Sequence, residues 1–518
     1  MQVHVRRLLL VALAGVLLAG CGSAPAVQQN PLVLDGPSIP DPGPSAPVPL
    51  KPIGFTGGAP LLWASEDELD RSLDAVAASG STRLRLDMAW PLLEPQPGVQ
   101  VWEPTDRVVD AALARGIEVL AILDYTPEWA AADPSLGLTS KPASAQEYGR
   151  YAGQVAQHFS GRVHHYEIWN EPNGKVFFAP WADPELYADM LREAYTQIKA
   201  VDPDAMVIGG AIGAVGDNEN TMNGLTFLKR MYAAGAQGYF DALSVHPYSY
   251  PGTLVGTESI PDGALRMIAD MRRHMLTHGD DQKQIWATEF GSPTDVGAGI
   301  TEDRQGELMT SFIREWSQLS FAGPMYVHEI RDRLAGSDNP EDNFGVLHRD
   351  FTPKPAYTAL TSAIKSGMLD DPEYLAMNAV AQSIPSLGES LTPVYPGHDR
   401  IGRPYVAQEF AGGVLFRSAN GFAMSPNQVA STVLASGFLP AGPYVQGIQQ
   451  LDADGGARVF HSERTGVHVV RGAILDAWTP EIGYPTSEEY QDGTGRVTDF
   501  EFGRIRWEVD SGAQVLAR

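Results

Sequence analysis

Eight short apolar runs alternate with amphipathic segments between residues 52 and 365, and this alternation constrains the fold more than any other feature of the sequence. Short apolar runs fit buried parallel strands, and the segments between them have helical periodicity. Ser65 and Glu68 form a capping-box pattern that predicts the start of a helix soon after the first run. The expected strands are residues 53–56, 83–88, 117–123, 163–169, 206–211, 240–246, 285–290 and 324–328.

Eight successive βα units predict an α/β protein with a (β/α)8 barrel, the TIM-barrel architecture. A doubly wound open sheet is the structural alternative, but no glycine-rich phosphate-binding loop follows the first run. In a barrel of this kind, catalytic side chains are expected at the C-terminal ends of the strands.

The composition divides the rest of the 518 residues into further segments. The stretch between residues 22 and 51 is rich in proline, alanine, glycine and serine, and it predicts an extended linker. The composition shifts again after residue 365. The predicted division is a signal peptide at 1–21, a proline-rich linker at 22–51, the barrel at 52–365, a second linker at 366–396 and a smaller β-rich repeat module at 397–518.

The N-terminus has the features of an export signal. Arg6 and Arg7 precede an apolar run over residues 8–18, which is well short of the ~20 residues needed to span a bilayer. The single cysteine, Cys21, follows Leu18, Ala19 and Gly20 in a pattern that resembles a bacterial lipobox. The resemblance implies lipidation of Cys21 and an exported lipoprotein on the outer face of the cell membrane or in the cell envelope. An ordinary secretory signal is the alternative.

The charge of the chain limits its partners. Asp and Glu number 63 against 37 Lys and Arg, which gives a net charge of -26. Such acidity disfavours nucleic acid and anionic membrane surfaces as partners, so membrane contact is expected through the lipid alone. One cysteine excludes an intrachain disulfide and a cysteine-based metal site, and no other metal-binding motif stands out. The acidity favours neutral over anionic glycans as substrates.

Two glutamates lie at strand ends where a barrel of this kind carries its catalytic side chains. Glu171 follows the fourth expected strand, and Glu289 ends the seventh. Glycoside hydrolysis requires such a pair, because one carboxylic acid protonates the leaving oxygen while one carboxylate attacks or activates water. A purely structural role for both carboxylates is the alternative.

Further polar and aromatic side chains at the strand ends are candidates for substrate binding, because apolar ring faces favour sugars and polar groups orient them. The tryptophans could instead pack loops, and Arg85 could pair with Asp87 or Glu118 rather than reach the site. The candidates are Arg85, Asp87, Trp90, Trp129, Asn170, His246, Tyr248, His328 and Glu329.

The order of these motifs resembles glycoside hydrolase clan A, most of all its families 39 and 5, over residues 52–365. The resemblance implies that Glu171 is the general acid/base, Glu289 the nucleophile, and that configuration is retained through a covalent glycosyl-enzyme intermediate. It also implies that Asn170 contacts the sugar 2-hydroxyl. The sequence departs from many clan members near His328, where a tryptophan platform is common. The motifs lie at residues 85–90, 125–130, 170–172, 246–248, 288–291, 343–345 and 354–357.

Within that assignment, the neighbours of Glu289 have physical roles. Arg85 is expected to keep Glu289 charged, and Tyr248 to donate a hydrogen bond to it. His246 is expected to orient neighbouring groups rather than to transfer protons. Glu167 shares the alternation of Glu171 and is expected to be a buried support.

The C-terminal 120 or so residues contain an internal repeat. Stretches beginning at residues 401, 437 and 482 each lead from a glycine-containing turn to an apolar, β-rich segment. They resemble the LGFP repeats of actinobacterial envelope proteins, which implies attachment to, or contact with, a cell-wall glycan. A module that only packs against the barrel is the alternative.

The sequence therefore predicts an exported, retaining glycoside hydrolase that acts on a neutral polysaccharide or oligosaccharide. No cofactor is expected, because two carboxylates and water supply the chemistry. A cell-envelope glycan of the arabinan or galactan type is the first expectation for the substrate. The alternatives are a secreted β-glycosidase for xylan, glucan or biofilm glycans, and a non-catalytic glycan-binding lipoprotein.

Overall fold

The computed structural model describes residues 39–517 except 40, 42, 44, 296, 298, 420 and 452–455. The expected signal peptide, the lipidation site at Cys21 and most of the first linker lie outside the described residues. Across the described part of the chain, no helix combines the length and apolarity needed to cross a membrane.

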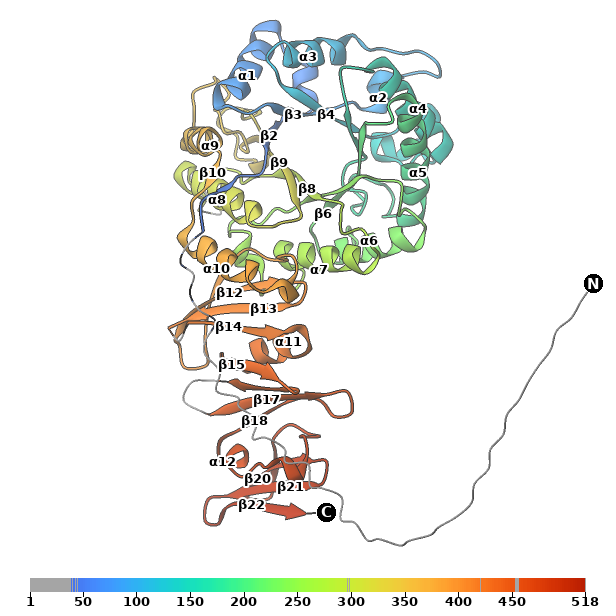
Figure 1. Ribbon diagram of the computed structural model, residues 1–518. Coiled ribbons are helices and arrows are strands. Elements are labelled where there is room, and N and C mark those ends of the chain that lie inside the picture. Colours follow the sequence, from blue (N-terminus) through green and yellow to red (C-terminus); the bar gives the residue numbers. More distant parts are fainter. Residues whose placement is uncertain are drawn as a thin grey trace, which may run out of the picture.

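Eight parallel strands close into a barrel, and a ring of helices surrounds it (Figure 1), which confirms the predicted fold. The first strand pairs with the last, with Phe55 opposite Val327, so the described barrel has no open edge. The strands are β2 (Ile53–Thr56), β3 (Arg83–Asp87), β4 (Glu118–Leu123), β5 (His165–Ile168), β6 (Met206–Gly213), β7 (Ala242–His246), β8 (Ile285–Phe290) and β9 (Ala322–Val327).

The helices begin on the C-terminal face of the barrel, because each returns the chain to the start of the next parallel strand. The predicted capping box is present: the Ser65 side chain accepts from the Glu68 backbone, and Glu68 accepts from the Ser65 backbone. The barrel helices are α1 (Glu66–Ser79), α2 (Trp90–Leu93), α3 (Glu103–Leu113), α4 (Ala145–His158), α5 (Pro184–Val201), α6 (Gly224–Ala233), α7 (Ala264–Thr277), α8 (Glu302–Ser317) and α9 (Pro355–Ser366).

The barrel interior is a packed core below the mouth. Trp286 and Tyr326 fill it together with Leu120 and Ile208. Two glycines make room for the aromatic rings: a Cβ at Gly323 would lie 2.3 Å from Trp286, and one at residue 54 would lie 2.6 Å from Tyr326. The interior is therefore closed below, and a ligand can enter the barrel only from the C-terminal face.

Three four-stranded antiparallel sheets follow the barrel and extend away from it in a row (Figure 1), in agreement with the three predicted repeats. Neighbouring sheets share apolar side chains, since Ile448 and Phe460 pack in one cluster with Phe500 and Ile505. The strands are β11 (Tyr395–His398), β12 (Pro404–Phe410), β13 (Gly413–Ser418), β14 (Gly421–Pro426), β15 (Pro440–Val445), β16 (Ile448–Leu451), β17 (Ala457–Ser462), β18 (Gly466–Arg471), β19 (Tyr490–Asp492), β20 (Gly495–Phe500), β21 (Gly503–Glu508) and β22 (Gly512–Ala517), with helices α11 (Asn427–Ser436) and α12 (Gly472–Asp476).

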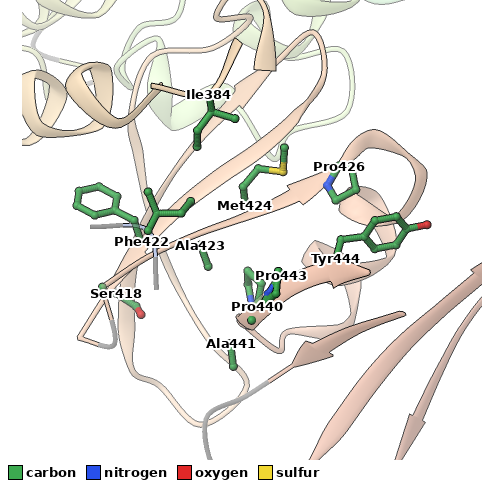
Figure 2. Close-up of a pocket in the computed structure, with 13 residues that line it drawn as sticks. Ile384, Ser418, Phe422, Ala423, Met424, Pro426, Pro440, Ala441, Pro443 and Tyr444 are labelled. Atoms are coloured by element: carbon green, nitrogen blue, oxygen red, sulfur yellow. The ribbon is translucent and has the colours of Figure 1, made fainter. Parts of the chain in front are cut away.

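An apolar hollow of about 340 Å³ lies between the first two sheets (Figure 2). Phe422 and Met424 of β14 and Pro440 and Pro443 of β15 are among the residues that line it. The described residues that line this hollow carry no charge, so it lacks the convergent polar groups that orient a sugar.

The described parts of the two expected linkers pack against each other. Residues 366–396 contain β10 (Met368–Leu369), α10 (Pro372–Gln382) and the short helix η6 (Pro385–Leu387), and β1 (Val48–Pro49) pairs with β10. Helix α10 lies between the barrel and the first repeat sheet (Figure 1).

Three arginines of α7 join the barrel to the C-terminal part of the chain. Arg272 is buried and donates through Nη2 to Glu389 at 2.8 Å. Arg266 and Arg273 both pair with Glu409 of β12, and the Nη2 of Arg266 lies 2.9 Å from its Oε1. The Glu409 side chain is only 6% exposed, so these pairs fix the first repeat against the barrel in a largely desolvated setting.

We expect Glu409→Gln to lower the free energy of unfolding by about 2 kcal/mol, because it removes a charge shared by two arginines in a largely buried interface. Urea unfolding followed by tryptophan fluorescence measures the change. Glu373→Gln is the matched control, because Glu373 forms an ion pair with Arg417 in which both side chains are substantially exposed, and we expect it to cost less than about 1 kcal/mol. Equal effects of the two substitutions on the free energy of unfolding would contradict the stabilising role of the Glu409 ion pairs.

Candidate active site

The two glutamates predicted to be catalytic lie together at the mouth of the barrel. Glu171 follows β5 with φ 42°, and its backbone N–H donates to the Ala211 carbonyl of β6 at 3.1 Å. Tyr125, Trp169 and Ala211 also have positive φ values. Non-glycine residues rarely adopt this conformation, and its concentration at three neighbouring strand ends is typical of a functional site.

Arg85 of β3 connects three side chains at the centre of this site. The buried guanidinium donates from Nε to Glu167 Oε2 at 2.6 Å, from Nη1 to Glu289 Oε1 at 2.6 Å and from Nη2 to Asn170 Oδ1 at 3.0 Å. Glu118, one of the two alternative partners of Arg85, is exposed and pairs with Arg83 instead. The structure thus places Arg85 in the site and shows Glu167 as its fully buried support.

Glu289 of β8 is held as a carboxylate. The Tyr248 hydroxyl donates to its Oε2 at 2.8 Å, while Arg85 donates to its Oε1. Burial alone would raise the pKa of the Glu289 carboxyl, but the positive charges of His246 and Arg85 outweigh burial and hold the pKa well below its usual range. Burial keeps the pKa of Tyr248 well above its ordinary value, so its hydroxyl remains a donor.

His246 of β7 bridges the two carboxylates. Its Nδ1 lies 2.9 Å from Glu171 Oε1 and 3.6 Å from Glu289 Oε2. Burial opposes protonation of the ring, but the two carboxylates raise its pKa overall. One ring nitrogen thus lies within 4 Å of an oxygen of each carboxylate, so the two side chains converge on the same point at the barrel mouth.

The two carboxylates have different surroundings. Glu289 receives donors from Arg85 and Tyr248, whereas the Glu171 side chain is bonded to His246 and is 23% exposed toward the mouth. Glu289, which is firmly ionised, can then provide a nucleophile, and Glu171, which is more open, can provide a proton donor in the same cavity.

The structure corrects the substrate-binding role predicted for Trp90. Its side chain has no exposed surface, stacks on Tyr151 at 5.1 Å and donates from Nε1 to Glu94 at 2.9 Å. Trp129 is half-buried, packs edge-on against Trp90 at 5.4 Å and donates to the Glu94 carbonyl. Trp90 therefore supports the loop that carries Trp129, and only Trp129 retains surface for a sugar.

Two aspartates lie near Arg85 at the ends of β3 and β4. Asp87, predicted to bind substrate, is half-buried, and this burial raises the pKa of its carboxyl. Asp124 was missed by sequence reasoning, although it follows an apolar strand just as Asp87 ends one. It is buried with Oδ1 unpartnered, and burial together with the charge of Asp87 raises its pKa well above the ordinary value.

His328 and Glu329 follow β9, which lies between β8 and β2 in the barrel. His328 Nδ1 lies 3.1 Å from the Thr56 hydroxyl and 3.9 Å from Glu289 Oε2. Burial lowers the pKa of His328 to about 4, so the ring is neutral near pH 7. Glu329 accepts from Arg333 Nε at 2.8 Å, yet burial raises its pKa to about 7.

The raised pKa of Glu329 makes stability depend on pH. A carboxyl whose pKa rises from 4.5 to about 7 on folding stabilises the protein fully below pH 4.5, and this contribution is lost as pH rises through 7. We expect the free energy of unfolding of the wild type to fall by about 3 kcal/mol between pH 4.5 and pH 8 because of this carboxyl. Glu329→Gln should lack this decrease. Urea unfolding of both proteins at pH 4.5 and pH 8 measures this change in the free energy of unfolding. An equal change in the wild type and in Glu329→Gln would contradict the raised pKa of Glu329.

No group of three or more His, Cys, Asp and Glu side chains that could hold a metal ion occurs among the described residues.

Comparisons with known proteins fit this geometry. The family model for cellulase, glycosyl hydrolase family 5, matches residues 46–320, and that for the LGFP repeat matches residues 482–518. A β-1,4-xylanase of Dictyoglomus thermophilum is 28% identical over 127 residues, covering 23% of this chain and 34% of the xylanase. A β-xylosidase of Caldicellulosiruptor saccharolyticus is 31% identical over 119 residues, covering 20% of this chain and 24% of the xylosidase. The chain thus spans about a third and a quarter of these relatives.

Solved structures are also similar to this chain. A family 39 glycoside hydrolase from Bacteroides cellulosilyticus WH2 is 21% identical, with 71% of each chain covered and a TM-score of 0.49. GH5_18 from Streptomyces cattleya is 18% identical, with 63% of this chain and 82% of that chain covered and a TM-score of 0.50. At such identities a structural likeness shows the fold alone. The family model, however, covers more than half of the chain, which therefore belongs to the cellulase family, glycosyl hydrolase family 5.

Proposed function

We propose that this protein hydrolyses glycosidic bonds with retention of configuration, with Glu289 as nucleophile and Glu171 as general acid and base. The observation that carries the proposal is the contact of His246 Nδ1 with both carboxylates, at 2.9 and 3.6 Å. Retention requires carboxyl groups ~5 to 5.5 Å apart, so that one of them reaches the anomeric carbon directly.

In the first step, Glu289 attacks the anomeric carbon as Glu171 gives its proton to the departing glycosidic oxygen, and a glycosyl ester forms on Glu289. In the second step, Glu171 takes a proton from water, which attacks the same carbon and releases the sugar and the free carboxylate. Asn170 accepts from Arg85 through Oδ1, which leaves its amide N–H groups as donors to a sugar hydroxyl.

For the substrate, we propose a neutral polysaccharide of the cell envelope, of the arabinan or galactan type. The net charge of -26 favours a neutral chain over an anionic one, and the match to the LGFP repeat supports contact with a cell-wall glycan through the C-terminal module. Export and lipidation at Cys21 remain part of this proposal. Loss of residues 1–20 on processing, with lipid on the new N-terminus, would be detected by mass spectrometry of the membrane fraction.

β-Xylan is the second candidate substrate, because both curated relatives carry names that refer to xylan or xylosides. Chromatography of products from arabinogalactan, arabinan, xylan and β-glucan separates the candidates, with Glu289→Gln as the inactive control. Products from arabinogalactan or arabinan support the envelope substrate, and products from xylan alone overturn it. Binding without products from any glycan would contradict hydrolysis and favour a binding protein.

A further inference from the structure

Two exposed tryptophans lie on the face of the barrel that carries the catalytic glutamates. Trp63 is 65% exposed and Trp181 is 52% exposed, whereas the other described tryptophans are buried or half-buried. A single exposed aromatic side chain needs no explanation, but two on the active-site face suggest a surface for ligand rings.

Their positions in the fold are equivalent. Trp63 ends the short helix η1 (Ala59–Trp63), three residues before α1 begins at Glu66. Trp181 lies three residues before α5 begins at Pro184. Both side chains therefore belong to connections that run from the C-terminal end of a barrel strand to the following helix, where TIM barrels bind substrates.

Trp63 borders a hollow between the first and last connections of the barrel. The hollow has a volume of about 320 Å³, and Thr56, Glu329 and Arg333 also line it. Thr56 contacts His328, whose Nδ1 lies 3.9 Å from Glu289 Oε2. An aromatic face beside an Arg333–Glu329 pair combines the apolar platform and the hydrogen-bonding groups that a sugar site needs.

Trp181 lies on the side of the proton donor. The connection from β5 to α5 carries both Glu171 and Trp181, and Lys175 within it lies 5.2 Å from the Trp181 ring. In a retaining hydrolase the acid protonates the oxygen of the departing half of the chain, while the nucleophile bonds to the other half. Trp63 is thus placed for the retained half of a substrate, and Trp181 for the departing half.

We propose that a neutral polysaccharide crosses the barrel mouth with its retained half against Trp63 and its departing half against Trp181, and that it is cut within the chain rather than at its end. This inference rests on the proposed hydrolase activity. It adds the direction of the substrate and an internal mode of cleavage.

The test compares Trp63→Ala and Trp181→Ala with the wild type on two substrates. The first is the polysaccharide that the wild type hydrolyses, arabinogalactan or xylan. The second is the 4-nitrophenyl glycoside of the corresponding single sugar. Phe502→Ala is the control, because Phe502 is 56% exposed but lies in the third repeat. We expect each tryptophan variant to lose about 10- to 30-fold in kcat/KM on the polysaccharide. Trp63→Ala should stay within about 2-fold of wild type on the monosaccharide glycoside, which is too short to reach that platform.

Two further measurements separate the two sides and the cleavage mode. Transfer of the glycosyl group to an added oligosaccharide acceptor should fall in Trp181→Ala but not in Trp63→Ala, because acceptors occupy the departing side. Early products from the wild type should be oligosaccharides of mixed length. Variants equal to Phe502→Ala on the polysaccharide, or release of single sugars alone from the start, would overturn this inference while leaving hydrolysis intact. A wild type inactive on every substrate would instead contradict the proposed function.

Discussion

Glu289→Gln is expected to abolish turnover, with kcat falling by at least about 10⁴-fold on any substrate that the wild type hydrolyses. The amide has the shape of the carboxylate but cannot form the glycosyl ester. The substitution also removes the charge that faces Arg85 at 2.6 Å, and among the described residues Glu167 then remains as the anionic partner at hydrogen-bonding distance of the guanidinium.

The matched control is Glu128→Gln, the same substitution at an exposed residue in a loop on the barrel mouth. We expect it to keep wild-type turnover. Residual activity of Glu289→Gln above about one per cent of wild type, measured by product release with high enzyme concentration, would remove Glu289 from the role of nucleophile.

Glu171→Ala is expected to show a loss that depends on the leaving group. A sugar leaving group requires protonation, so kcat/KM should fall by about 10²- to 10⁴-fold. A 2,4-dinitrophenolate leaves without a proton, so formation of the glycosyl ester should be nearly unaffected and its hydrolysis should become slow. A burst of dinitrophenol followed by a slow steady rate is the expected time course.

Azide gives the second readout for Glu171→Ala. A small anion fits the space left by the carboxylate and attacks the glycosyl ester without a general base. We expect azide to accelerate turnover and to yield a glycosyl azide with the configuration of the substrate. An equal loss on both leaving groups, with no response to azide, would contradict the role of Glu171.

The sequence was sufficient to predict the barrel and the meeting of Glu171 and Glu289 at its mouth, for a physical reason. Strands of a parallel barrel are covered on both faces, so each forms a continuous apolar run between polar segments. All eight runs became strands, and their C-terminal ends share one face, which brings Glu171 and Glu289 together. The contact of Arg85 with Glu289 followed from the same placement, whereas its contacts with Glu167 and Asn170 were not predicted.

Properties that depend on packing could not be predicted in the same way. Trp90 follows β3 in the sequence, but whether it faces a ligand or the core depends on Tyr151 of α4, a distant helix. Trp63 belongs to no motif, and its importance depends on an exposed fraction that only the fold determines. The pKa of Glu329 likewise depends on burial by surrounding loops.

The stereochemistry of hydrolysis tests the central claim most directly. Proton NMR of the reaction, recorded within the first minutes and before mutarotation, identifies the anomer that is released first. We predict the anomeric configuration of the substrate, because the proposed mechanism has two successive displacements at the same carbon, the first by Glu289 and the second by water. First release of the opposite anomer would show a single displacement by water and would contradict the assignment of Glu289 as nucleophile.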